Sequence, residues 1–439
     1  MSSQLIDAHS PENSEPRSAL FDIVVTGIGI ATPLGLGCSV NLDRLLAGDS
    51  GVKNEILPGV DDCHSIAAGR CPDFDLSSRL RFPKSLKYMS RPAQLAMHAA
   101  LEAFETSRLQ RDQIDPFRLA IYTASGQTGL DYKEFSRALE AAWGHDREPD
   151  FRHVGGMPTK LIDPYFSLRT LANGGMGLLS AEFGAKGPSN NFVHSDNAPA
   201  LALQAAFWDL AEGRCDAAIV GGFDSLIYPT ALFALSEAGE PTGDAPHFGQ
   251  SVPGEGAAFF ILERRGEALE RGADILAEIM AIECSQEPLV RNSEESLGRG
   301  LRKLLQRLPE RCRSSQFAVS PGNAPRGSVA NALGQGQIVG SERPLVSSLL
   351  WATGYLGAAT AAVELALGLL SVRRGFVPSV MVIEEFNDGS SATFDETAAA
   401  IDTPDPTGIF FSRSWSGQIA MIVARAYSAA GKAFGACGP

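Results

Sequence analysis

Short apolar runs alternate along this chain with longer segments in which apolar residues recur at helical spacing. The runs are rich in Val, Ile, Phe and Ala and are bounded by glycine or polar residues, a pattern that predicts buried strands. The predicted strands are residues 21–30, 118–122, 217–220, 257–262, 317–319, 345–348 and 418–424. The predicted helices are residues 90–106, 200–210 and 357–370. Strands that alternate with helices predict an α/β fold, a mixed sheet with helices packed on its faces.

Composition places the chain among ordinary globular proteins. Of its 439 residues, 44% are hydrophobic and 20% are charged, and the length leaves room for two or three domains. The net charge of −14 argues against nucleic acid or an anionic membrane as a partner. No apolar run reaches membrane-spanning length without polar interruption, and the first residues lack the basic and apolar regions of a secretory signal. We therefore expect a cytoplasmic protein.

The sequence carries no motif for a metal or a nucleotide cofactor. Its seven cysteines show no metal-ligand spacing and are expected to be reduced thiols. The glycines near the first predicted strand do not form a G-x-G-x-x-G pattern. We expect neither a metal nor a cofactor.

The stretch 187–196 is the most informative part of the sequence. It ends in Asp196, between an apolar segment at 177–183 and a helical run at 198–212, so it predicts a strand, a sharp turn and a helix. A thiol at the start of that helix would have a lowered pKa and could attack a thioester. A carboxylate there is stabilised by the same helix dipole but is a much weaker nucleophile.

Several further segments occur in a family-specific order. They are residues 23–29 with 33–35, 45–48 with 50–52, 217–225, 253–258 with Glu263, and 353–359 with 363–364. With these segments the chain resembles the β-ketoacyl-[acyl carrier protein] synthases of the thiolase superfamily from about residue 22 to 425. The resemblance implies a thiolase-like fold, with duplicated βαβαβαββ halves in a five-layer α-β-α-β-α arrangement. It divides the chain into a disordered tail at 1–20, halves at 21–265 and 266–427, and a second tail at 428–439.

The catalytic residues of that family are missing. The resemblance implies a cysteine and two histidines, and their positions are occupied here by Asp196, Pro321 and Tyr355. The lysine that usually precedes the second histidine is matched by Leu350. The seven histidines are residues 9, 64, 98, 145, 153, 194 and 247, so the C-terminal part of the chain contains none. Condensation needs a thiolate and donors that stabilise an enolate oxygen, so we do not expect this chain to condense acyl groups by itself.

Some relatives in the family are non-condensing subunits. Chain-length factors replace the cysteine, pair with an active ketosynthase and shape a shared acyl tunnel. The resemblance therefore implies a catalytically degenerate, chain-length-factor-like subunit of a type II polyketide, fatty-acid or polyene synthase. Its expected partners are an active ketosynthase, or a second copy of itself, and an acyl carrier protein. Two alternatives stay open: an acyl-carrier-dependent dehydratase, isomerase, hydrolase or acyltransferase, and a scaffold without a pocket.

Three groups of candidate residues follow. The pocket candidates are His194, Asp196, Tyr355 and Trp415. Asp196 has an alternative role as the cap of the following helix, with Asn197 beside it and Pro199 in the first turn; Trp415 either gates the pocket or packs in the core. The candidates for binding a carrier protein are Arg79, Arg81, Lys84, Lys87 and Arg91, which could equally form a solvated helix face. The dimer-interface candidates are Asn190, Asn191, Phe192, Val193 and His194.

Overall fold

The computed structural model describes residues 22–56, 65–126, 136–137, 140–141, 162–194, 196–237, 252–287, 294–312, 314–319, 345–378, 380–383, 392–394, 398–414 and 417–427. The predicted tails at 1–20 and 428–439 lie outside these residues, as do Pro321 and Trp415.

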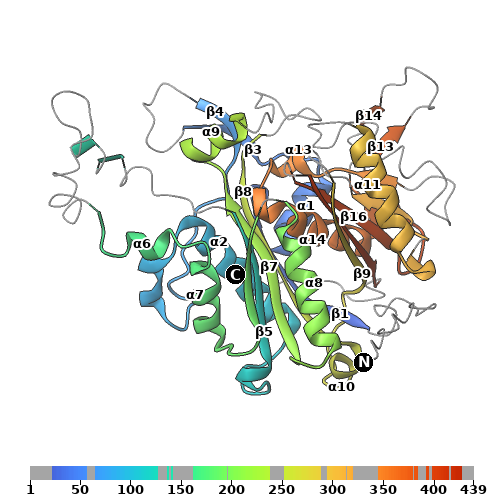
Figure 1. Ribbon diagram of the computed structural model, residues 1–439, viewed down its shortest axis with the longest axis horizontal. Coiled ribbons are helices and arrows are strands. Elements are labelled where there is room, and N and C mark those ends of the chain that lie inside the picture. Colours follow the sequence, from blue (N-terminus) through green and yellow to red (C-terminus); the bar gives the residue numbers. More distant parts are fainter. Residues whose placement is uncertain are drawn as a thin grey trace, which may run out of the picture.

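Two half-sheets with the same strand order form the centre of the molecule (Figure 1). The first consists of β1 (Ile23–Thr32), β5 (Leu119–Ser125), β6 (Ser189–Val193), β7 (Ala217–Ser225) and β8 (Glu255–Arg264). The second consists of β9 (Ala277–Gln286), β10 (Phe317–Val319), β11 (Leu345–Ser347), β16 (Thr407–Arg413) and β17 (Gln418–Ala426). The order is β6-β5-β7-β8-β1 in the first and β11-β10-β16-β17-β9 in the second. In each, three parallel strands are followed by two antiparallel ones, which confirms the predicted duplication.

The half-sheets join edge to edge, where Ile23, Val24 and Val25 of β1 pair with β9. The chain passes from one to the other between β8 and β9, through α10 (Arg265–Glu270). Three short strands complete this sheet: β13 (Val380–Ile383) and β14 (Ala392–Phe394) extend it beyond β11, and β2 (Gly35–Leu36) pairs with the end of β1. Two small separate ladders are β3 (Val52–Ile56) with β4 (Ser65–Gly69), and β12 (Phe376–Val377) with β15 (Ala399–Ala400).

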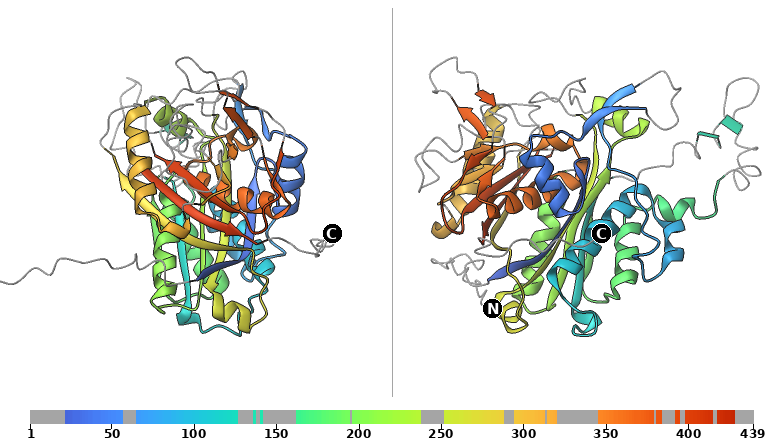
Figure 2. Two further views of the ribbon diagram at one scale, coloured as in Figure 1. Left: turned by 90° about the vertical axis from the view of Figure 1, so that its right-hand side faces the viewer. Right: turned by 180° about the vertical axis from the view of Figure 1, so that it is seen from behind.

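Helices form three layers around the half-sheets (Figures 1 and 2). The outer layer on the first half-sheet holds α2 (Arg91–Ser107) and α7 (Gly174–Phe183); the middle layer holds α8 (Ala198–Ala211) and α14 (Thr360–Arg373); the other outer layer holds α11 (Glu294–Arg307). The remaining helices are α1 (Cys38–Leu46), α6 (Phe166–Arg169), α9 (Pro229–Glu237) and α13 (Leu350–Thr353). Short 3-10 turns cover Pro83–Tyr88, Pro116–Arg118, Glu310–Cys312 and Gly357–Ala359.

Successive residues of the buried strands face opposite sides of the sheet, and this explains why helices form a layer on each side. In β8, Phe260 packs in the core that contains α8 and α14, whereas Phe259 packs in the core under α2 and α7. In β16, Phe410 faces the middle layer and Phe411 faces α11. Because successive strand residues point to opposite faces, each half-sheet is covered on both sides. The five-layer arrangement expected from the sequence is confirmed.

Two glycines of β1 let α2 lie directly on the strand backbone. A Cβ at Gly27 would be 2.0 Å from the carbonyl oxygen of Ala103, and one at Gly29 would be 2.0 Å from that of Ala99. The carboxylate of Glu102 on the same helix accepts hydrogen bonds from the backbone N–H groups of Ile30 (2.8 Å) and Cys38 (2.6 Å). The helix that the sequence predicts at 90–106 is thus fixed on the first strand.

Candidate functional site

Asp196 lies where β6 gives way to α8. The strand ends at Val193 and the helix begins at Ala198, as the strand–turn–helix prediction requires. Asp196 is 2% exposed, so its carboxylate is removed from solvent at the start of a buried helix. A buried charge is retained only with compensation from neighbouring dipoles or protons.

The structure places the N-cap position of α8 one residue beyond Asp196. The N-cap residue of α8 is Asn197 and not Asp196, and the Asn197 side chain makes no capping hydrogen bond. Instead its Oδ1 accepts a hydrogen bond from Ser412 Oγ on β16 at 2.9 Å. Pro199 lies in the first turn of α8, where backbone N–H groups have no partner within the helix. The N–H that proline lacks therefore removes no helical hydrogen bond. Asn197 therefore links the start of α8 to the second half-sheet.

A second carboxyl group, Glu364 on α14, acts on the same site. Glu364 is 3% exposed, and within the described residues its Oε1 has no hydrogen-bond partner. Burial, and then the nearby charge of Asp196, raise the pKa of Glu364 well above its ordinary value. The sequence analysis placed Glu364 in a family motif but gave it no role, because the pair spans two helices that meet only in the folded chain.

Tyr355 is buried in the segment that connects α13 to α14. It is 5% exposed, and its backbone N–H donates to the carbonyl of Val252 at 2.7 Å. Its own carbonyl accepts from the N–H of Gly254 at 2.8 Å. Gly354 before it has φ 73°, a conformation that favours glycine. The segment is thus pinned to the chain just before β8.

His194 and Asp196 are not presented by one continuous strand. β6 ends at Val193, and the half-buried His194 follows it, with its backbone N–H 3.3 Å from the carbonyl of Ser125. Burial lowers the pKa of His194. The alternation that would place both side chains on one strand face therefore stops before they are reached.

Asp224 is a site residue that the sequence analysis missed. It is the second-last residue of β7, is 4% exposed, and accepts hydrogen bonds from the N–H groups of Ser225 (2.9 Å) and Ala358 (3.0 Å). Desolvation raises its pKa to about 7. It lines a cavity at the carboxyl ends of β5 and β7, the usual place for a ligand in an open α/β sheet. Tyr88, Ser90, Ser125, Arg169, Leu171 and Phe223 also line this cavity.

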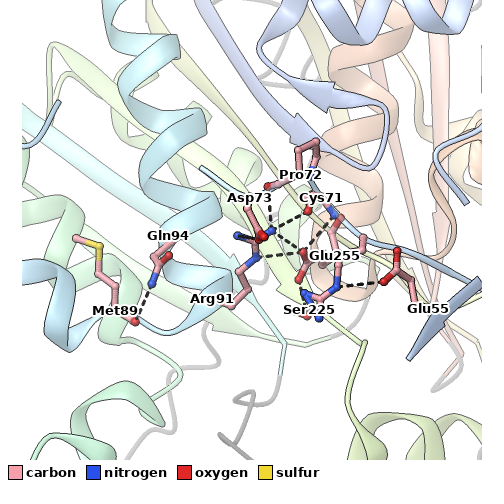
Figure 3. Close-up of polar contacts among 10 residues, drawn as sticks. Glu55, Cys71, Pro72, Asp73, Met89, Arg91, Gln94, Ser225 and Glu255 are labelled. Carbon is pink, nitrogen blue, oxygen red and sulfur yellow. Dashed lines mark hydrogen bonds and ion pairs between the residues drawn. The ribbon is translucent and has the colours of Figure 1, made fainter. Parts of the chain in front are cut away.

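Arg91, predicted within the carrier-protein cluster, is bound to a buried acid instead (Figure 3). Its Nε and Nη2 donate to Oε1 of Glu255 at 3.1 and 2.9 Å, and Glu255 is only 2% exposed. Oε1 also accepts from the N–H of Cys71, and Oε2 accepts from Ser225 Oγ at 3.0 Å. Arg91 Nη2 further donates to the carbonyls of Cys71 and Pro72. This network holds α2 to the start of β8.

The other cations of the cluster lie at the surface. Arg79 forms an ion pair with Glu105 at 3.0 Å, and Arg81 and Lys84 are exposed. Lys87 Nζ lies 4.9 Å from the ring centre of Tyr88 and 4.6 Å from that of Tyr165. Phe82, which lies between Arg81 and Lys84 in the sequence, has a side chain that is 47% exposed. The Arg81 guanidinium lies 5.0 Å from its ring centre. Lys84 and Lys87 are exposed on the 3-10 helix Pro83–Tyr88, whereas Arg79 and Arg81 precede it, so the cluster does not lie on one continuous helix. Whether it binds a carrier protein or is a solvated face stays a prediction.

Strand β6 stands at the end of the strand order. Among the described residues it pairs only with β5, so its other edge has backbone groups free of strand pairing. Val193 is 49% exposed on it, and Leu168 (48%) and Leu171 (52%) are exposed apolar residues of the preceding segment. The candidates Asn190, Asn191 and Phe192 lie on this strand, Asn190 being exposed and the other two half-buried.

The described ranges hold no cluster of three or more His, Cys, Asp or Glu residues suited to a metal ion. Five cysteines in these ranges are free thiols: Cys38, Cys71, Cys215, Cys284 and Cys312. No helix within the same ranges combines the length and the apolar character needed to cross a membrane.

Comparison of the sequence with models of known protein families shows which family the chain belongs to. Residues 21–268 match the model of the beta-ketoacyl synthase N-terminal domain. The chain belongs to the beta-ketoacyl synthase family. The match contains the first half-sheet, its outer helices, the β6–α8 junction with Asp196, and the Arg91–Glu255 network.

Relatives within this family include polyketide beta-ketoacyl synthases and a 3-oxoacyl-[acyl-carrier-protein] synthase. A Streptomyces cyaneus protein assigned as a polyketide beta-ketoacyl synthase is 31% identical over 268 residues, 58% of this chain and 61% of that protein. A Streptomyces halstedii protein assigned as polyketide beta-ketoacyl synthase 2 is 30% identical over 61% of this chain and 62% of its own length. These matches span less than two thirds of either relative. The 3-oxoacyl-[acyl-carrier-protein] synthase 2 of Vibrio harveyi is 25% identical over 84% of this chain and 89% of its own.

Solved structures of the family share the fold. The ishigamide ketosynthase/chain length factor aligns over 93% of this chain and 100% of its own, with a TM-score of 0.75 at 20% identity. A type II ketosynthase solved with its acyl carrier protein aligns over 92% and 99%, with a TM-score of 0.71 at 19% identity. At these identities the likeness establishes the thiolase-like ketosynthase fold alone.

Proposed function

We propose that this chain is a non-condensing, chain-length-factor-like subunit of a type II polyketide, fatty-acid or polyene synthase. The observation that carries the proposal is Asp196, buried at the start of α8, where a condensing relative needs a thiolate. A carboxylate cannot hold the acyl chain as a thioester during condensation. The chain also has no histidine beyond residue 247 to supply the enolate-stabilising donors.

We propose that the chain pairs with an active ketosynthase through β6. An uncovered strand edge is a pairing site, and natural proteins cover such edges. Val193 on this strand, and Leu168 and Leu171 in the segment before it, are exposed apolar residues. A partner that keeps the cysteine and both histidines would supply the chemistry, and this chain would supply one wall of the acyl tunnel.

The carrier-protein surface of the proposal is the exposed basic and aromatic group Arg81, Phe82, Lys84 and Lys87. Acyl carrier proteins are acidic, and charge complementarity of this kind accelerates and orients docking. Arg91 is not part of this surface, because Glu255 binds its guanidinium. Arg81→Glu and Lys84→Glu are therefore expected to weaken carrier binding, with an effect that shrinks as salt is added.

The cavity at the ends of β5 and β7 is the proposed tunnel wall. Ala172 and Leu171 line it, and the carbonyl of Ala172 accepts a hydrogen bond from Ser125 Oγ at the end of β5, the strand that pairs with β6. Larger side chains at Ala172 and Leu171 are therefore expected to shorten the product without abolishing turnover by the pair. A change in product length on Ala172→Phe, read by mass spectrometry of the reconstituted pair, tests this role.

Pairing itself is tested by light scattering on the purified chain, alone and mixed with a ketosynthase that retains all three catalytic residues. We expect a one-to-one complex that Val193→Lys disrupts. Val40→Lys is the matched control, because Val40 is 47% exposed on α1, far from β6 in sequence. A chain that stays monomeric and ignores the ketosynthase contradicts the proposal; a homodimer alone favours self-pairing.

A second candidate is an acyl-carrier-dependent enzyme with changed chemistry. Asp224 favours it, because a carboxyl group with a pKa of about 7 that lines a cavity suits general acid–base work. Incubation of the chain alone with 3-hydroxyacyl and acyl thioesters of a carrier protein tests this candidate. Dehydration or hydrolysis that disappears in Asp224→Asn would support it over the non-condensing subunit.

A further inference from the structure

A polar cavity of about 660 Å³ lies at the amino ends of the parallel strands β10 and β16, in the second half-sheet. It is lined by Gln316 before β10, Thr407 at the start of β16 and Arg425 near the end of β17. All of its described lining residues except Pro404 carry a polar or charged side chain. Its volume is within the range of small-molecule sites in proteins. The cavity that contains Asp224 lies in the other half, at the carboxyl ends of β5 and β7, so the two are separate sites.

The internal duplication identifies the first-half counterparts of these lining residues. The equivalent strands β5 and β10 pair at their first residues with β7 and β16, one residue after Asp216 and Thr407 respectively. The next pairing in each half leads to β8 and β17, one residue before Arg264 and Arg425 respectively. Asp216 therefore corresponds to Thr407, and Arg264 corresponds to Arg425.

In the first half, Asp216 neutralises two arginines. Arg118 donates to both carboxylate oxygens of Asp216, at 2.6 and 3.0 Å. Arg264 donates to Oδ1 of the same carboxylate at 2.8 Å. These lengths are close to those of charge-assisted hydrogen bonds. This position of the fold therefore suits a carboxylate that lies between guanidinium groups.

In the second half, a threonine stands where that carboxylate would be. Thr407 Oγ1 lies 3.5 Å from Arg425 Nε, and Oε2 of Glu278 lies 3.9 Å from Arg425 Nη1. The same oxygen of Glu278 lies 3.9 Å from Arg265 Nη1 and accepts a hydrogen bond from the Tyr427 hydroxyl at 2.8 Å. A separation of 3.9 Å is too long for a hydrogen bond. Glu278 therefore leaves N–H groups of both guanidinium groups available to a ligand in the cavity.

The charges around the cavity indicate the kind of ligand. Three arginines and three acids line it: Arg265, Arg311, Arg425, Asp22, Glu278 and Asp405. Glu278 is 5% exposed, whereas Asp22 and Asp405 are exposed. Because cations and acids are equal in number, the cavity does not suit a polyanion. Guanidinium groups bind a single carboxylate or phosphate group with paired hydrogen bonds, and the acids can accept hydrogen bonds from hydroxyl groups of the same ligand.

We propose that this cavity binds a small molecule that carries one carboxylate or phosphate group together with hydroxyl groups. Arg425 and Arg265 hold the anionic group, which takes the place that the Asp216 carboxylate has in the first half. The proposal goes beyond the subunit function, because it holds whether or not the chain pairs with a ketosynthase.

Isothermal titration calorimetry on the full chain tests this site with inorganic phosphate, glycerol 3-phosphate and gluconate. Sodium chloride at the same ionic strength is the reference, and comparison of the probes distinguishes a phosphate from a carboxylate ligand. We expect saturable binding that Arg425→Gln weakens about tenfold or more, because the variant loses charge-assisted hydrogen bonds to the ligand. Arg374→Gln is the matched control and should bind as the wild type does. The side chains of Arg374 and Arg425 are both 35% exposed, and Arg374 pairs with Asp43 of α1.

Thr407→Asp provides a second test, because it restores the carboxylate that the first half has. The new side chain should pair with Arg425, as Asp216 pairs with Arg264, and should abolish binding of the probes. Urea unfolding of the same samples shows whether each variant is folded, and Thr407→Asp decides if Arg425→Gln is not. The proposal is overturned if no probe binds the wild type saturably, or if sodium chloride reproduces the response. Binding that the folded variants of Arg425 and Thr407 leave unchanged also overturns it.

Discussion

Replacement of Arg91 by alanine should destabilise the chain far more than loss of a surface charge. The guanidinium makes two hydrogen bonds to Oε1 of Glu255, at 2.9 and 3.1 Å, and the acid is 2% exposed. Breaking a buried ion pair by removing one partner costs about 3–5 kcal/mol. Ser225 Oγ and the N–H of Cys71 still donate to the carboxylate, and the Arg91 side chain is 26% exposed. We therefore expect the lower end, about 3 kcal/mol.

The assay is urea unfolding of the wild type, Arg91→Ala and Arg79→Ala at neutral pH. Arg79 is the matched control, because its partner Glu105 is 62% exposed and such a pair is worth about 1 kcal/mol or less. Adding Glu255→Gln to Arg91→Ala should recover part of the loss, because the unpaired charge disappears. Equal urea-unfolding midpoints for Arg91→Ala and Arg79→Ala would refute the reasoning. Arg91 would then again be a candidate residue of the carrier-binding surface.

Three further outcomes are expected. Asp196→Cys can accept an acyl group, visible in the intact mass, but will not condense on its own, because no histidine lies beyond residue 247; product from this variant without a partner would contradict the assignment of the missing residues. Gly408→Ala should cost about 1–3 kcal/mol in urea unfolding, since a Cβ there would lie 2.0 Å from the ring of Phe317, whereas Gly266→Ala meets nothing within 4 Å and should be neutral. Asp224→Asn should flatten the fall in stability between pH 3.8 and about 7, because burial raises the pKa of Asp224 and its contribution is lost as the pH rises; an unchanged pH profile would show that Asp224 is not the group responsible.

Local pattern predicted the secondary structure well. The helix expected at 90–106 is α2 (Arg91–Ser107), and the one expected at 200–210 is α8 (Ala198–Ala211). The helix expected at 357–370 begins with a 3-10 turn and continues as α14 to Arg373. All 14 residues of α14 are buried, and the run of small and apolar residues in its sequence already indicated a core position.

The local sequence pattern could not predict which side chains contact each other. Arg91 looked like part of a basic surface because the acid that binds it lies 164 residues away in the sequence. Asp196 and Asn197 are equally good N-cap residues, so only the backbone geometry shows that the helix starts after Asn197. The effect of the Asp196 charge on the pKa of Glu364 arises because α8 and α14, which belong to different halves, pack against each other. The roles proposed for Pro321 and Trp415 remain predictions.

The central claim is that this chain shapes a product that another subunit makes, and reconstitution tests it most directly. Malonyl and acyl thioesters of a carrier protein are incubated with the chain alone, with a ketosynthase that retains the cysteine and both histidines, and with the two together. The account predicts elongated product of one defined length only from the pair, none from the chain alone, and a changed length with Ala172→Phe in this chain. Elongation by the chain alone, or a product from the ketosynthase that is identical with and without this chain, would contradict it.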